Sequence, residues 1–109
     1  MEKEYYENLK FITLQYGETS QLCMAMEECG ELITSLNKYM RKFQVSDEEK
    51  QECYNNVLEE VSDVYVMLDQ IKEIIGLDSD NIREIMRAKA ERQVKRINEQ
   101  IAQGRLERK

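Results

Sequence analysis

The chain has no proline and only four glycines among its 109 residues. Proline and glycine interrupt helices and build the tight turns that many-stranded β proteins need. Their scarcity argues against an immunoglobulin-like sandwich or a many-turned barrel, and it favours long helices. A chain of this length forms one domain, so we expect a single domain over residues 1–109.

Apolar residues recur at spacings of three and four along most of the chain, which is the pattern of amphipathic helices. Gly17 and Gly76 stand where two of these stripes end, as glycines after helix ends do. Ser46 followed by Glu49 predicts a capping box, and Asp78 predicts another N-cap. The last residues, 105–109, are expected to fray. The sequence therefore predicts an all-α, four-helix bundle with helices near 5–16, 19–43, 46–75 and 78–103.

Charge excludes several classes of partner. The chain has 16 basic and 22 acidic residues and a formal net charge of −6. Proteins that bind duplex nucleic acid or membrane surfaces need surplus Lys and Arg, so neither partner is expected. No apolar run is long enough to span a bilayer, and the charged segment MEKEYYENLK is not a signal peptide. Three cysteines without C-x-x-C spacing predict reduced, buried thiols and a cytoplasmic protein.

Two acidic motifs stand out in the second and third predicted helices. The first is Glu27-Glu28-Cys29-Gly30-Glu31, and the second is Glu59-Glu60-Val61-Ser62-Asp63. Each places two carboxylates three residues apart, on one face of a helix. The pairs Glu28–Glu31 and Glu60–Asp63 also lie at the edge of the apolar stripe. If the two helices pack antiparallel, as a short joint implies, the pairs lie near the two midpoints and face each other.

Carboxylates gathered at a partly buried place repel one another, and burial adds a desolvation cost. Protonation, basic partners or a cation would relieve this cost. With carboxylate ligands alone the cation would be a hard one, Mg²⁺ or Mn²⁺, or else Ca²⁺. Histidine is absent, which excludes His-based zinc sites and histidine general bases. The alternative is that these acids are solvated charges paired with Lys or Arg across the bundle.

The paired motifs resemble the MazG-like, all-α nucleotide pyrophosphohydrolases, which carry E-E-x-x-E on one helix and E-x-x-D on the next. The resemblance extends over about residues 16–97. It includes YGETSQ at 16–21, ELITSLNKYMRK at 31–42 and KAERQVKR at 89–96, which is similar to the family's K-x-x-K-N-x-x-R element. Gln93 stands where that element has asparagine.

The resemblance implies an Mg²⁺-dependent cytoplasmic enzyme, with Mn²⁺ as a substitute. It would cleave a nucleoside triphosphate, ribo or deoxy, to the monophosphate and pyrophosphate as nucleotide-pool housekeeping. The implied metal ligands are Glu28, Glu31, Glu60 and Asp63. The doublet Glu27–Glu28 would be catalytic, with Glu27 orienting or deprotonating the attacking water. The implied substrate-binding residues are Lys89, Arg92, Arg96 and Gln21.

Two other hypotheses remain open from the sequence. One is a non-catalytic helical module that binds protein partners or nucleotides, in which the acids determine packing or hold a structural cation. The other is a family member that binds nucleotides without cleaving them. In any of these cases the broad apolar faces predict self-association, as a homodimer or a dimer of dimers.

Overall fold

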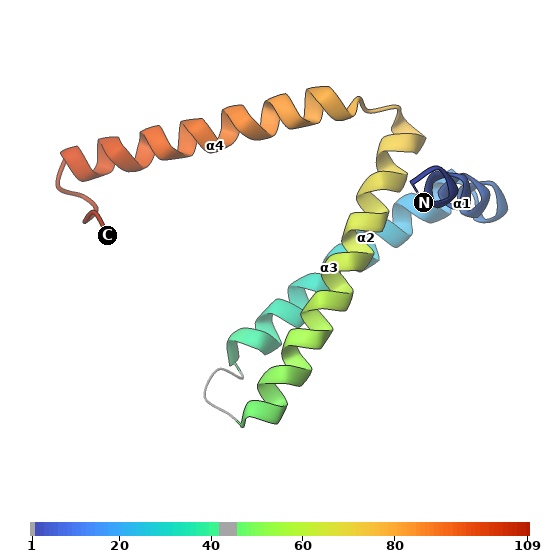
Figure 1. Cartoon of the computed structure of the whole chain (residues 1–109), viewed down its shortest axis with the longest axis horizontal. Helices are drawn as coiled ribbons and strands as arrows, with labels where there is room; N and C mark the ends of the chain where they lie inside the picture. Colours follow the sequence, from blue (N-terminus) through green and yellow to red (C-terminus); the bar gives the residue numbers. More distant parts are fainter. Residues whose placement is uncertain (1, 42–45) are drawn as a thin grey trace. The chain divides into compact units, whose positions relative to one another are not determined.

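The computed structural model describes residues 2–41 and 46–109, and every regular element within these ranges is an α-helix. The predicted all-α class is therefore confirmed for the described part of the chain. The predicted end of the second helix, Phe43, lies outside the described residues. The described helices are α1 (Glu2–Tyr16), α2 (Glu18–Arg41), α3 (Asp47–Ile75) and α4 (Ser79–Ala102) (Figure 1).

The helix ends follow the local signals in the sequence. Gly17 and Gly76 have φ angles of 95° and 82°, the left-handed conformation that terminates a helix at low cost for glycine. The Ser46 hydroxyl accepts a hydrogen bond from the Glu49 backbone N–H at 3.3 Å, at the start of α3. The Asp78 carboxylate caps α4 by accepting from the backbone N–H two residues later, at 3.1 Å. The predicted helix ends at Gly17 and Gly76 and the predicted N-caps at Ser46 and Asp78 are confirmed, while the return bond from the Glu49 side chain that completes a capping box stays a prediction.

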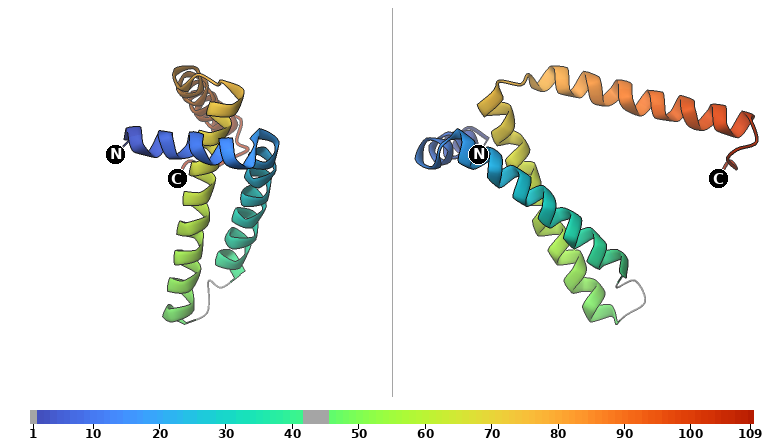
Figure 2. Two further views of the ribbon diagram at one scale, coloured as in Figure 1. Left: turned by 90° about the vertical axis from the view of Figure 1, so that its right-hand side faces the viewer. Right: turned by 180° about the vertical axis from the view of Figure 1, so that it is seen from behind.

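The chain forms two compact units, residues 1–76 and 77–109. In the first unit α2 and α3 form an antiparallel hairpin and make its most extensive helix–helix contact. Two views show these helices side by side, with α1 crossing them near the joint between α1 and α2 (Figure 2). The single domain over residues 1–109 stays a prediction.

A polar contact joins α1 to α3. The Tyr5 hydroxyl donates a hydrogen bond to Asp69 Oδ2 at 2.8 Å, and Lys72 Nζ lies 3.1 Å from Asp69 Oδ1. Burial, followed by the hydrogen bond and the negative charge of Asp69, raises the pKa of Tyr5 to about 12. Tyr5 therefore stays protonated and keeps donating across the physiological pH range.

The first unit has few buried apolar side chains. Among the described residues these are Leu9, Ala25 and Cys53. The prediction of buried thiols is right for Cys53 and wrong for the other two cysteines, Cys23 and Cys29, which are exposed in this chain because they lie on the open sides of α2. The side chains of Gln21, Ser35 and Gln70 are buried as well, so much of the interior between α2 and α3 is polar.

The second unit consists of α4 and the short segments before and after it, residues 77–109. No residue of α4 is buried within this chain. The segment 105–109 is not helical, as predicted, yet it is not wholly frayed, because Arg108 Nη2 donates to Asn98 Oδ1 at 3.3 Å. No described helix has the length and apolar character needed to cross a membrane.

Two glycines predict opposite effects of the same substitution. A Cβ at Gly30, within α2, would meet nothing within 4 Å, so Gly30→Ala should stabilise the fold by about 1 kcal/mol through helix propensity. Gly76 has a positive φ, so Gly76→Ala should destabilise it by about 1–2 kcal/mol. Urea unfolding of both variants measures the difference. A loss of stability in Gly30→Ala would reveal a close neighbour outside this chain.

Candidate metal centre

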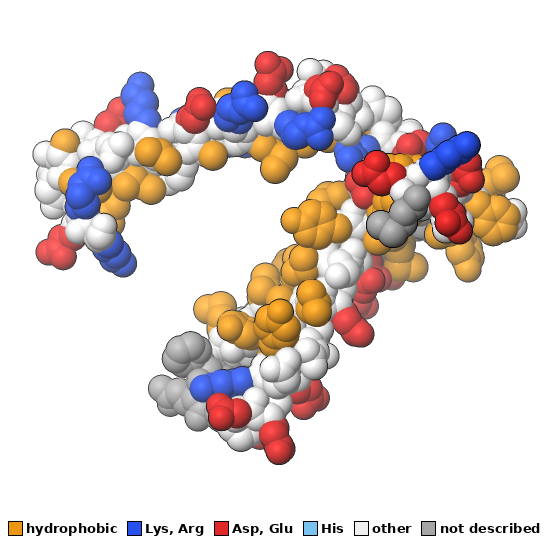
Figure 3. Space-filling model, viewed as in Figure 1, with side chains coloured by type: hydrophobic (Ala, Val, Ile, Leu, Met, Phe, Trp, Pro, Cys, Tyr) orange, Lys and Arg blue, Asp and Glu red, His pale blue; other side chains and the backbone are white. Residues whose placement is uncertain are grey.

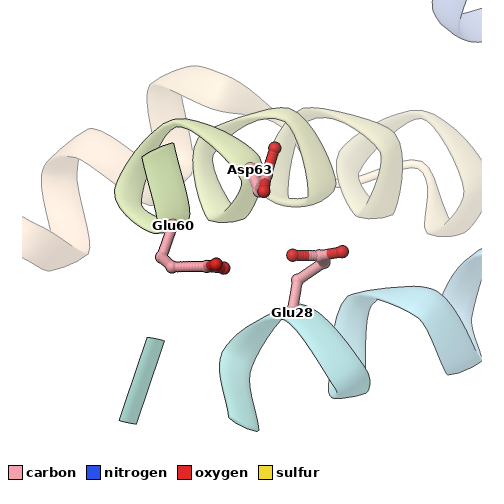
Figure 4. A group of neighbouring side chains, drawn as sticks. All are labelled: Glu28, Glu60 and Asp63. Atoms are coloured by element: carbon pink, nitrogen blue, oxygen red, sulfur yellow. The ribbon is translucent and has the colours of Figure 1, made fainter. Parts of the chain in front are cut away.

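Three carboxylates converge between α2 and α3. Glu28 comes from the middle of α2, and Glu60 and Asp63 come from one turn of α3. One oxygen from each carboxylate lies within 4.8 Å of the others. Glu28 and Glu60 extend toward each other in the space between the two helices, and Asp63 lies close by on α3 (Figure 4). The antiparallel hairpin thus brings the two acidic motifs together, as the sequence predicts.

The two glutamates of this cluster have lost part of their contact with water. Glu28 and Glu60 are half-buried, whereas Asp63 is exposed. The Oε2 atoms of Glu28 and Glu60 are buried and have no hydrogen-bond partner among the described residues. A buried carboxylate oxygen without a donor is costly, so a ligand that supplies positive charge would be stabilised here.

The pKa values of the two glutamates also show that ionised carboxylates are unfavourable here. The pKa of Glu28 lies above the ordinary value of a glutamate, chiefly because of desolvation by burial and next because of the charge of Glu31. The pKa of Glu60 is raised for the same two reasons, in the same order. Asp63 adds a smaller charge effect on both glutamates. Glu28 and Glu60 therefore resist ionisation, first because they are desolvated and next because other carboxylates lie close by.

The other predicted metal ligand and the predicted base lie at the rim of this cluster. Glu31 is exposed and lies outside the group of three, but it borders an adjoining hollow together with Glu60. Glu27 is exposed on α2, beside Glu28. Carboxylate oxygens are the ligands that Mg²⁺ and Mn²⁺ prefer. The donor set and the two unpartnered oxygens fit such a cation.

The predicted substrate-binding residues lie in different places. Gln21 is buried in the first unit, near the start of α2. Lys89, Arg92 and Arg96 are exposed on α4, in the second unit. None of the four belongs to the carboxylate cluster.

The sequence analysis missed two buried polar residues that lie on the same helix faces as the carboxylate cluster. On α2, Ser35 follows Glu28 by seven residues and is 8% exposed, and its hydroxyl has no hydrogen-bond partner among the described residues. On α3, Gln70 follows Asp63 by seven residues and is 1% exposed, and its amide is likewise unpartnered there. Seven residues are nearly two helical turns, so residues at this spacing lie on the same helix face as the acids. This spacing could have identified Ser35 and Gln70 from the sequence.

Comparisons of the chain with protein-family models, with curated proteins and with solved structures found no match.

The raised pKa values predict how the metal-free protein responds to pH. A carboxyl with a higher pKa in the folded than in the unfolded state penalises the fold when it is ionised. This penalty is relieved as the pH falls through the folded-state pKa. The melting temperature in a chelator should therefore rise on acidification from neutral pH to about pH 5. The chain has no histidine to titrate in this range.

Glu28→Gln should melt higher than the wild type at neutral pH and gain less on acidification. The matched control is Glu27→Gln, which also removes one negative charge but does so at the exposed residue next to Glu28. A wild-type melting temperature that falls steadily over the same range would contradict the described electrostatics.

Proposed function

We propose that this chain is a MazG-like, Mg²⁺-dependent nucleoside triphosphate pyrophosphohydrolase that acts on the cytoplasmic nucleotide pool. The observation that carries the proposal is the convergence of carboxylates from two helices, with two buried oxygens that lack donors among the described residues. The motif resemblance supplies the reaction, in which a nucleoside triphosphate and water give the monophosphate and pyrophosphate. The substrate is a ribo- or deoxyribonucleotide.

In this proposal Glu28, Glu60 and Asp63 hold Mg²⁺ or Mn²⁺, and Glu31 completes the ligand set from the rim. When bound, such an ion offsets charge that develops on the triphosphate oxygens and lowers the pKa of a water ligand. Glu27 accepts a proton from the attacking water, since the chain has no histidine for this step. As that water bonds to phosphorus, the phosphoanhydride bond breaks and its electron pair leaves with the departing phosphate oxygen.

The remaining predicted residues bind rather than react. Lys89, Arg92 and Arg96 supply positive charge to substrate phosphates, since guanidinium and ammonium groups form charge-assisted hydrogen bonds with phosphate. Gln21 is buried, so its amide would have to leave this position to contact a substrate.

A single substitution tests the metal assignment. Glu60→Gln keeps the shape of the side chain and removes one charge. The metal-free variant should be at least as stable as the wild type, because repulsion falls. Its gain in melting temperature on adding Mg²⁺ should shrink, because a bound ion stabilises by RT ln(1 + [L]/Kd). Release of pyrophosphate from common nucleoside triphosphates should fall by orders of magnitude.

The control is Glu59→Gln, which removes the same charge from an exposed neighbour on α3. It should keep the response to Mg²⁺. If Mg²⁺ and Mn²⁺ leave the wild-type melting temperature unchanged, the metal assignment fails. If Mg²⁺ binds but no nucleoside triphosphate is cleaved, the chain is a helical binding module with a structural cation.

Self-association is the second part of the proposal. Apolar side chains gather over the visible face of the first unit and, separately, along one side of α4 (Figure 3). The α4 stripe has a spacing of three and four, and none of its residues is buried within this chain. A face of this length is costly in water, so we propose that second copies cover it in a homodimer or homotetramer. The stripe consists of Ile82, Met86, Ala90, Val94, Ile97 and Ile101.

Sedimentation equilibrium at micromolar concentration should give two or four times the chain mass of 13.0 kDa. Val94→Glu places a charge in the α4 stripe and should shift the protein toward the monomer. Ala88→Glu adds the same charge on the opposite side of α4 and should not. A wild type that sediments as a monomer would contradict the proposal.

A further inference from the structure

A hollow of about 160 Å³ lies beside the carboxylate cluster, between α2 and α3. Its two ends differ in charge. Glu31 and Glu60 form one end, next to the cluster, and Lys38 belongs to the other, two turns further along α2. The remaining lining is polar apart from one thiol, and consists of Thr34, Ser35, Cys53 and Asn56.

The hollow contains hydrogen-bond donors without partners. The Ser35 hydroxyl is buried and unpartnered among the described residues. Lys38 forms no ion pair within the described part of the chain. Asn56 adds a side-chain amide from α3. A buried hydroxyl without a partner is costly, and an ammonium group beside it favours an anionic ligand that accepts from both.

Size and shape restrict what this ligand can be. Drug-sized ligands occupy sites of about 300–1,000 Å³, so the hollow is too small for a whole nucleotide. It has the volume of roughly five water molecules, which suits a small polyatomic anion rather than a single ion. Among the described residues no aromatic side chain lines it, so these residues offer no surface on which a nucleobase would stack.

A second hollow, on the side of Lys38 away from the carboxylate cluster, limits how far a bound anion can extend. A neighbouring hollow of about 250 Å³ shares Lys38, Cys53 and Asn56 and is also bordered by Glu49 and Glu52. These two carboxylates repel a phosphate group. An anion that begins at a cation held by Glu60 would therefore end at Lys38.

Resting on the proposed function, we infer that this hollow binds the pyrophosphate portion of the substrate. Lys38 and the amide of Asn56 contact phosphate oxygens, and the Ser35 hydroxyl donates from the buried wall. Glu28, Glu60 and Asp63 would hold the cation that neutralises the same phosphates at the other end of the hollow. This assigns substrate contacts to three residues outside the acidic motifs and outside the basic segment of α4.

The test measures binding of inorganic pyrophosphate to the full chain by calorimetry in the presence of Mg²⁺. Lys38→Gln should weaken pyrophosphate affinity about tenfold or more, as expected when a charge-assisted hydrogen bond is lost. Lys38→Arg should restore much of it. Ser35→Ala should weaken binding without altering charge. The affinity for Mg²⁺ alone should stay unchanged in these variants, and Lys10→Gln, on α1, is the charge-matched control.

The outcomes separate this inference from the proposed function. If the wild type binds pyrophosphate and Lys38→Gln binds it equally well, the inference is wrong, whether or not the chain hydrolyses nucleotides. It is also wrong if Lys38→Gln weakens binding of a nucleoside monophosphate but not of pyrophosphate. Pyrophosphate binding that depends on Lys38, in a wild type that cleaves no nucleotide, supports the inference and overturns the proposed function. Melting curves confirm that each variant is folded.

Discussion

The cost of gathering carboxylates between α2 and α3 is the constraint on which the rest of this structure depends. Glu28 and Glu60 each keep a buried oxygen without a donor among the described residues, and the pKa of each is raised, chiefly by desolvation. A helical hairpin that only needed to fold would place leucine or alanine there. The acids instead weaken the contact that holds the two longest helices of the first unit together.

Within the described residues the fold has few other favourable terms to set against this cost. Of the described residues in the first unit only a few apolar side chains are buried, and α4 buries none. Hydrophobic burial is the main favourable term in folding, so a lone copy has little of it to set against the polar interior. A bound cation would remove the repulsion, and a second copy would cover the apolar faces. The proposed cation would therefore relieve the electrostatic cost, and the proposed self-association would add the missing hydrophobic burial.

The sequence predicted the parts of the structure that local rules control. The caps at Ser46 and Asp78 and the turn at Gly76 follow from side-chain hydrogen bonds and backbone sterics, which act within a few residues. The meeting of the two acidic motifs followed from the antiparallel hairpin. The hollow at Lys38 could not be predicted in this way, because it depends on which residues of α3 lie opposite α2. Nor could the exposure of Cys29, since a stripe of apolar residues does not reveal which of its members a neighbour covers.

The spacing of the polar residues has a further consequence for how the two helices align. Gln21, Glu28 and Ser35 recur every seven residues on α2, and Gln70 and Asp63 do so on α3. If α3 slid by one turn, a carboxylate of one helix would lie against an apolar side chain of the other. Polar groups at a helix interface specify alignment at the expense of stability, as single buried polar residues do in coiled coils. These polar residues thus make the α2–α3 hairpin less stable, but they also disfavour pairings in which one helix has slipped by a turn. The same residues that weaken the contact between the helices therefore determine how the helices align.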